Sequence, residues 1–518
     1  MPHTSASAGP SEAHSLALPV LQSAPTRGCD DIHKINEKKE KCGVFAIWGS
    51  KDAVRLTYTS LYALQHRGQE SAGIATSDGQ SLKAHAGMGL VPEVFNHDAI
   101  ERLERRNPAA AIGHVRYSTT GNSVLANCQP MVQRLAGTEV AIAHNGNLIN
   151  GIAWRHKFEQ KGHIFTTESD TESIFHLLAA PEAQDSPDPT AWALRRCEGA
   201  FSLAMLWPDR IEVARDPWGW RPLVLGLLPS GRHVVSSETV AFDVIGAKLV
   251  REIEPGEIVT LSAKGISSRR FADPAKRLAQ CVFEHVYFAN PASNLFGQNV
   301  QLAREAMGAA LAHEAPVEAD CVMPMPDSGR SAAHGYAQAS GLPYREGIVP
   351  NRYVGRTFIK PTQAERTTAV RLKLNIIPEV VAGKRLIVVD DSVVRGTTTR
   401  VKMDQLRAAG AKEIHLRISC PPIRHPCFFG VDFASREQLI ANDRTVEEIR
   451  EFLGIDSLHY LSLDGLLGVM QRAPESYCTA CYTGDYRLDV EHPVTDEFAE
   501  QKQLRMFAHS TSQATADA

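Results

Sequence analysis

Residues 385–400 read RLIVVDDSVVRGTTTR and join a short apolar run to two adjacent acids and a loop of glycine and threonine. The apolar run is typical of a buried strand, and a helical pattern follows it. Backbone N–H groups in such a loop at a helix N-terminus can cradle a phosphate. The carboxylates of Asp390 and Asp391 can take sugar hydroxyls and a hydrated Mg²⁺. The stretch therefore predicts a phosphosugar site, and the simpler alternative is an acidic strand end before an ordinary capped helix.

The sequence around this stretch alternates between strands and helices. CVMPMP (321–326) and EIHLRIS (413–419) predict further strands, and helical patterns cover 300–313, 331–340 and 398–409. Such alternation indicates a doubly wound parallel sheet, which binds ligands beyond the carboxyl ends of its strands. From about residue 473 the apolar periodicity is lost, which predicts a loose tail.

The first half contains many short strands and a few helices. The apolar run CGVFAIWG (42–49) predicts a buried strand, and short alternating or apolar runs continue to about residue 270. This pattern predicts sheets faced by helices, so the whole chain is expected to have two domains, one α+β and one α/β. Residues 1–41 are low in complexity and then charged, which predicts a flexible extension without the features of a secretory signal.

Polar segments lie between the predicted strands of the first half. Arg116 in GHVRYSTTG suits an α-carboxylate, because a guanidinium binds carboxylates bidentately. Asn145 and Gly146 in AHNGNL can aim a side-chain amide and a backbone N–H at a developing oxyanion. Asp170 in SDTE offers an acceptor for a ligand ammonium. Each has a simpler alternative: a structural Arg116–Asp170 ion pair, an Asn-Gly turn, and for Cys42 a small buried side chain.

In this order after Cys-Gly-Val-Phe, these segments and LQHRGQESAGIA (64–75) resemble the glutamine-hydrolysing domain of N-terminal-nucleophile amidotransferases over residues 42–270. The resemblance implies a four-layer αββα domain in which Cys42 is the first residue of the mature protein. It also implies that the Cys42 thiolate attacks the glutamine amide and that the free α-amino group, whose unperturbed pKa is ~8, relays the proton. The resemblance thus implies cleavage between Lys41 and Cys42. The residues implied at the glutamine and oxyanion site are Arg116, Asn145, Gly146 and Asp170.

The second half resembles the type I phosphoribosyltransferases. MPMPDSG (323–329) stands where that fold has its pyrophosphate loop, and NRYVGRTFI (351–359) resembles the mobile loop that closes over the substrate. The resemblance implies a Mg²⁺ ion near Ser328, Asp390 and Asp391. The residues implied in binding phosphoribosyl diphosphate are Asp327, Ser328, Arg352, Tyr353, Arg356, Asp390, Asp391, Ser392, Arg395, Gly396, Thr397 and Thr398.

A glutaminase joined to a phosphoribosyltransferase is similar to the family of glutamine phosphoribosylpyrophosphate amidotransferases. This resemblance implies that ammonia from glutamine passes internally to C1 of 5-phosphoribosyl diphosphate, giving 5-phosphoribosylamine, glutamate and pyrophosphate, the first step of purine synthesis. It also implies inhibition by purine nucleotides and a homo-oligomer, tetramer or dimer. The expected boundaries are 1–41 for a propeptide, 42–272 for the glutaminase, 273–472 for the phosphoribosyltransferase and 473–518 for the tail.

One departure from the family pattern concerns iron. Many relatives hold a four-iron cluster with four cysteines, and Cys427, Cys478 and Cys481 stand at three of those places, but Val240 stands at the fourth. Such clusters normally take four thiolates. A bound iron–sulfur cluster is therefore disfavoured, and the three cysteines are interpreted as a remnant.

Other departures lie near the phosphosugar half. Asn290, Ala292 and Pro350 replace an arginine, an acid and a lysine of the family pattern, which could weaken substrate binding, alter subunit contacts or change the response to inhibitors. They leave open a regulatory paralogue that binds phosphoribosyl diphosphate or nucleotide without turnover, although the retained Cys42 and acidic pair argue against it. A hexosamine-forming synthase would share the first domain but lacks the phosphoribosyl signature.

Composition limits the remaining classes. Lys+Arg 55 against Asp+Glu 59 gives a formal charge of −4, so the chain lacks the basic excess of a nucleic-acid binder. No apolar run approaches the ~20 residues that span a bilayer. The 10 cysteines are unevenly spaced, which suits a reducing compartment better than a disulfide framework. We therefore expect a cytoplasmic enzyme with no nucleic-acid or membrane partner.

Overall fold

The computed structural model describes residues 42–117, 124–351, 374–431, 433, 436–488 and 490. Two antiparallel sheets make up the first half. The larger has seven strands, in the order β11 (Lys248–Glu252), β9 (Val224–Leu227), β10 (His233–Ser236), β1 (Gly43–Trp48), β4 (Ala110–Arg116), β2 (Ser71–Ser77) and β3 (Leu82–Met88). The other has six, in the order β13 (Gly265–Arg270), β12 (Glu257–Ser262), β8 (Arg210–Arg215), β7 (Gly199–Leu206), β6 (Thr138–Leu148) and β5 (Met131–Leu135).

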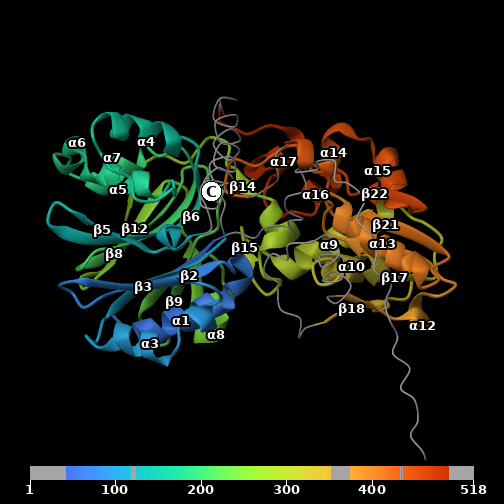
Figure 1. Cartoon of the computed structure of the whole chain (residues 1–518), viewed down its shortest axis with the longest axis horizontal. Coiled ribbons are helices and arrows are strands. Elements are labelled where there is room, and N and C mark those ends of the chain that lie inside the picture. The colour runs from blue at the N-terminus through green and yellow to red at the C-terminus, as the bar shows by residue number, and fades with distance from the viewer. Residues whose placement is uncertain are drawn as a thin grey trace, which may run out of the picture. The chain divides into compact units, whose positions relative to one another are not determined.

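Both sheets are covered on both faces. In β1, Val44 and Ala46 belong to the core between the sheets, whereas Phe45 and Ile47 belong to the core under the helices. Because successive side chains of a strand point to opposite faces, a strand buried on both sides reads as an unbroken apolar run. The expected four-layer αββα architecture is confirmed (Figure 1).

Short helices form the two outer layers (Figure 1). The seven-stranded sheet is covered by α1 (Ala53–Ala63), α2 (Val91–Val94), α3 (His97–Glu104) and α8 (Val240–Ile245). The six-stranded sheet is covered by α4 (Gly151–Gln160), α5 (Glu172–Ala179), α6 (Pro181–Gln184) and α7 (Pro189–Leu194). Two 3₁₀ turns, η1 (Gln65–Arg67) and η2 (Leu125–Asn127), lie in the connections.

The second half is built on a parallel sheet, as expected for a doubly wound domain. Its strands follow the order β17 (Cys321–Pro324), β20 (Arg385–Asp390), β21 (Glu413–Ile418) and β22 (Ser457–Tyr460). The helices are α9 (Val300–Glu314), α10 (Arg330–Ser340), α12 (Pro378–Val381), α13 (Thr397–Ala408), α14 (Ile440–Asp443), α15 (Val446–Leu453) and α16 (Leu463–Gly468), with η4 (Arg436–Gln438) before α14. The bounds of α9, α10 and α13 agree with the predicted helices.

Small elements connect the two halves. After β14 (Gln280–Cys281) the chain forms a π-helix, η3 (Glu284–Phe288), and then the short pair β15 (Asn294–Leu295) and β16 (Gln298–Asn299). A further pair, β18 (Ile348–Pro350) and β19 (Leu374–Ile376), flanks the undescribed segment 352–373. None of the helices in the described ranges is long and apolar enough to cross a bilayer.

The expectation of a loose tail from residue 473 is wrong for its first part. Residues 474–483 form η5 (Pro474–Ser476), β23 (Tyr477–Cys478) and α17 (Ala480–Thr483). β23 pairs in parallel with β14, and Tyr477 is fully buried. The segment is too short to show a period, but it completes a core formed by residues far away in the sequence.

Candidate functional site

Cys42 lies immediately before β1, with 7% of its surface exposed. Gly43 pairs with Val115 across β1 and β4, which brings Cys42 beside Arg116 at the end of β4. The Cys42 Sγ lies 3.7 Å from the carbonyl oxygen of Tyr117. Burial raises the pKa of the Cys42 thiol, and the charge of Arg116 only partly opposes this. A thiol with a raised pKa needs an adjacent base to become a nucleophile.

The predicted oxyanion residues lie on β6 near the start of β1. The Asn145 Nδ2 donates to Ser237 Oγ at 3.5 Å, and the same hydroxyl accepts from the Val44 backbone N–H at 2.9 Å. Gly146 has φ = 156°, and a Cβ on it would come within 1.9 Å of the Ala200 carbonyl oxygen. Only glycine fits there, because any side chain would collide with the neighbouring strand.

Asp170 lies just before α5 and is bonded to the same strand. Its Oδ2 accepts from the Leu148 N–H at 2.8 Å and lies 3.7 Å from His144 Nδ1. The Arg116 Nη1 lies 3.9 Å from Glu70 Oε2, so Arg116 has a partner other than Asp170. Cys42, Arg116, Asn145, Gly146 and Asp170 thus lie around neighbouring strand ends of the two facing sheets.

The acidic pair lies at the end of β20 in the second half, with Asp390 as the last residue of the strand. Asp390 and Asp391 are both buried, with 6% and 1% of their surfaces exposed. The Ser328 Oγ donates to Asp390 Oδ1 at 3.4 Å, and the Ser392 Oγ donates to Asp391 Oδ2 at 2.6 Å. Two carboxylates and a hydroxyl are oxygen donors of the kind Mg²⁺ takes together with water and substrate phosphates. The donor set therefore fits a magnesium ion.

The loop after the acidic pair leads directly into α13. Gly396 precedes this helix with φ = 75°, and a Cβ on it would meet Ile440 Cδ1 at 2.5 Å. Arg395 is half-buried in this loop, and Thr397 and Thr398 form the first turn of α13. The unbonded N–H groups of a helix start suit an anion, so the predicted strand–loop–helix geometry is present.

The remaining predicted residues come from two other segments of the chain. Asp327 is exposed in the loop after β17 and pairs with Arg330 at 3.2 Å. Arg352, Tyr353 and Arg356 lie outside the described residues.

The cysteines of the predicted remnant have a fourth neighbour. Cys427, Cys478 and Cys481 are free thiols, and Cys281 pairs with Cys478 in the ladder between β14 and β23. Burial raises the pKa of Cys478 to about 12, and the neighbouring Cys281 adds to this. Within the described ranges, no group of three or more His, Cys, Asp or Glu side chains could hold a metal ion. With Val240 at the remaining place, the residues do not fit a four-iron cluster, and we derive no step through one.

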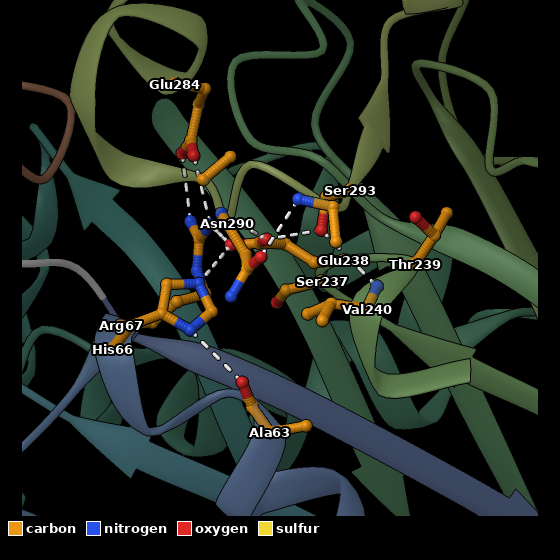
Figure 2. A network of polar contacts seen from close by, with 12 residues as sticks. Ala63, His66, Arg67, Ser237, Glu238, Thr239, Val240, Glu284, Asn290 and Ser293 are labelled. Carbon is orange, nitrogen blue, oxygen red and sulfur yellow. Dashed lines mark hydrogen bonds and ion pairs between the residues drawn. The ribbon is translucent and has the colours of Figure 1, made fainter. Parts of the chain in front are cut away.

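A buried network of charges was not predicted from the sequence (Figure 2). The Arg67 guanidinium contacts the carboxylates of Glu238 and Glu284, and its Nε donates to the Cys42 carbonyl oxygen at 3.0 Å. Glu238 also accepts from His66 Nε2 at 2.8 Å. His66 and Arg67 lie in the segment 64–75, and Glu238 and Glu284 lie beside apolar runs. A charged residue next to a predicted buried run is the one sequence signal that could have identified them.

The substituted positions Asn290 and Ala292 lie at the edge of this network (Figure 2 shows Asn290). The Asn290 N–H donates to Glu238 Oε2 at 2.9 Å, and its side-chain oxygen accepts from the Ala292 N–H at 3.0 Å. Relative to the family pattern, Asn290 removes a positive charge and Ala292 removes a negative charge. The backbone N–H of Asn290 still donates a hydrogen bond to Glu238. Pro350 ends β18 and lies opposite Leu374 of β19.

Comparisons with known proteins agree along nearly the whole chain. A family described as a glutamine amidotransferase domain matches residues 114–244. The amidophosphoribosyltransferase of Synechococcus elongatus is 46% identical over 90% of this chain and 95% of its own length, and that of Bacillus subtilis is 46% identical over 89% and 96%. The structure of the glutamine phosphoribosylpyrophosphate amidotransferase from B. subtilis, complexed with ADP and GMP, matches with a TM-score of 0.81 and 45% identity, covering 87% of this chain and 98% of that one. The two halves, their order and these relatives together show that the chain belongs to the amidophosphoribosyltransferase family.

Proposed function

We propose that Cys42 is the nucleophile of a glutaminase whose ammonia the second half adds to 5-phosphoribosyl diphosphate. Family membership makes the chain a glutamine-dependent enzyme of purine synthesis and favours it over the regulatory paralogue. The observation that carries the residue assignment is the proximity of Cys42 to Arg116, together with the Ser237 hydroxyl that joins Asn145 to Val44, two residues after Cys42. We also propose the domain boundaries 42–272 and 273–472, with residues 474–488 packed on the core.

In the first reaction the Cys42 sulfur attacks the glutamine side-chain amide. Once residues 1–41 are removed, the free α-amino group of Cys42 takes the thiol proton and passes it to the leaving ammonia. The Asn145 amide and the Gly146 N–H stabilise the oxyanion that forms. Arg116 holds the glutamine carboxylate, and Asp170 holds its ammonium. Water then releases glutamate and restores the thiol.

In the second reaction ammonia bonds to C1 of the ribose, and the C1–oxygen bond to pyrophosphate breaks. Asp390 and Asp391 orient the ribose hydroxyls, and the loop Ser392, Arg395, Gly396, Thr397 and Thr398 binds the sugar phosphate. The proposed contacts of the pyrophosphate are Asp327, Ser328, Arg352, Tyr353 and Arg356. Magnesium held by Ser328, Asp390 and Asp391 would supply charge neutralisation for the pyrophosphate when bound.

Regulation and assembly are proposed from the relatives. The B. subtilis relative is complexed with ADP and GMP, which supports purine nucleotides as inhibitors of this chain. As part of the same proposal, the chain forms a homo-oligomer, either a tetramer or a dimer, and is located in the cytoplasm.

The test measures glutamate release from glutamine with and without phosphoribosyl diphosphate and Mg²⁺. Intact mass first identifies the N-terminus of the active protein. Strong stimulation with matching pyrophosphate release, from a chain that begins at Cys42, is the expected result. Active protein that retains Met1 to Lys41 would contradict the proposed proton relay, and processed protein without stimulation would contradict the coupled reaction.

A further inference from the structure

Glu284 joins two buried arginines from distant parts of the first half. Its carboxylate accepts from Arg67 Nη1 and Nη2 at 3.0 and 2.9 Å, and from Arg221 Nη1 at 3.3 Å (Figure 2 shows the Arg67 side). All three side chains are fully buried. Such pairs are little screened by water, and removing one partner leaves an uncompensated buried charge. The three groups are therefore expected to hold one another in place.

Arg67 and Arg221 each connect Glu284 to the surroundings of Cys42. Arg67 Nε donates to the Cys42 carbonyl oxygen at 3.0 Å. Arg221 Nε donates to the Phe429 carbonyl oxygen at 3.1 Å. The preceding carbonyl, that of Phe428, accepts from Asn147 Nδ2 at 2.8 Å, and Asn147 follows the oxyanion glycine. Both the nucleophile and the oxyanion segment of β6 thus depend on the position of one carboxylate.

On its other side Glu284 begins the π-helix η3, which contacts the phosphoribosyl half. Arg304 of α9 donates to the carbonyl oxygens of His285 and Ala289 at 2.7 and 2.8 Å, at the two ends of this π-helix. The Ser331 hydroxyl of α10 donates to Gln301 Oε1 of α9 at 2.6 Å, and Ser328, just before α10, donates to Asp390 Oδ1 at 3.4 Å. Helix α9 therefore contacts η3 through Arg304 and contacts the start of α10, beside the acidic pair, through Gln301. π-Helical turns recur at functional sites in proteins.

We propose that Glu284 is a positioning residue that couples phosphoribosyl diphosphate binding at the acidic pair to the Cys42 glutaminase site. A displacement at the acidic pair passes through Ser328, the start of α10 and α9 to Arg304 and η3, and Glu284 passes it on to Arg67 and Arg221. The Cys42 carbonyl and the segment 428–430 then move together. This inference rests on the proposed function and adds to it the residues that link its two reactions.

The test compares Glu284→Gln with the unaltered chain and with Glu101→Gln, which makes the same change on the exposed face of α3. Three rates are measured for each: basal glutamate release, glutamate release with phosphoribosyl diphosphate and Mg²⁺, and pyrophosphate release with ammonia. The readout is the stimulation ratio, stimulated over basal kcat/KM for glutamine. Allosteric coupling is typically about 5- to 150-fold. Glu284→Gln should lower the ratio by such a factor, with ammonia-dependent pyrophosphate release within about threefold of the unaltered chain.

The outcomes separate this inference from the proposed function. An unchanged ratio in folded Glu284→Gln, beside a stimulated unaltered chain, overturns the inference alone. Equal losses of all three rates also overturn it, because they indicate a purely structural role. If Glu284→Gln does not fold, Glu284→Asp decides in its place, since it keeps the charge but withdraws the carboxylate by one methylene. Absence of stimulation in the unaltered chain overturns the proposed coupling and this inference with it.

Discussion

Gly430 lies directly against Gly146: a Cβ on Gly430 would come within 2.9 Å of the Gly146 carbonyl carbon. The two glycines come from the two halves of the chain, and Gly146 carries the proposed oxyanion N–H. Both have positive φ, at 93° and 156°. The wall of the proposed glutaminase site is therefore formed in part by the second half of the chain.

Gly146→Ala should abolish glutaminase activity more than it disturbs the second reaction. The added methyl would meet the Ala200 carbonyl oxygen at 1.9 Å, so β6 must shift and the oxyanion donor moves with it. Loss of one such donor typically lowers kcat by about 10²–10³-fold. Gly231→Ala is the matched control, because Gly231 has φ = 78° and nothing within 4 Å of the added Cβ. Equal glutaminase kcat in both variants would contradict the assignment.

Cys42→Ala should remove glutamate release and leave ammonia-dependent pyrophosphate release within about threefold of the unaltered chain. The reason is that only the first reaction needs the thiol. Cys197→Ala, a change at another buried cysteine that lies in the core of the six-stranded sheet, should keep both rates. The measurement is a paired assay of glutamate and pyrophosphate, and loss of the ammonia-dependent rate in Cys42→Ala would argue against separate sites.

Asp390→Asn should impair the second reaction and spare the first. Loss of one buried carboxylate of the acidic pair should lower pyrophosphate release, from either glutamine or ammonia, by about 10²-fold or more, while basal glutamate release persists. Asp209→Asn, on an exposed side chain, serves as the control. Retained pyrophosphate release in Asp390→Asn would place the acceptor site elsewhere.

Glu238 should make the folded chain sensitive to acid. Burial alone would raise its pKa, but His66 and Arg67 hold the pKa of this carboxyl well below its usual 4.5. Between the two pKa values the unfolded chain binds more protons, so the stability that Glu238 contributes is complete above about pH 4.5 and declines as pH falls. Glu238→Gln should cost about 3–5 kcal/mol near neutral pH, because Arg67 loses a buried partner. Thermal unfolding from pH 7 to pH 3 checks this: the variant should show a smaller acid-induced fall in Tm, and parallel profiles would refute it.

The local elements could be predicted because their signals are local. An unbroken apolar run such as residues 42–49 identifies a strand buried on both faces, and the 3.6-residue period identifies α9, α10 and α13. The acidic pair and the glycine–threonine loop could also be found, since strand, loop and helix start are consecutive in the chain.

The ordered part of the tail could not be predicted. Residues 474–483 form elements of two to four residues, which are too short to show a period, and Tyr477 is buried against partners distant in sequence. The proximity of Cys281 to Cys478 could not be predicted either, because no ligand-like spacing in the sequence relates the two cysteines.

The sequence by itself determined the order of the two domains and predicted the phosphosugar loop, whose residues are consecutive in the chain, and the candidate nucleophile, whose accompanying segments follow it in a fixed order. Only the tertiary structure decided how the sites are connected. Arg67, Arg221 and Glu284 look like ordinary charged residues in the sequence, and they become one network because folding removes all three from water at the same place. A charge buried away from water is costly unless it is paired with an opposite charge, and in this network the paired residues come from both halves of the chain.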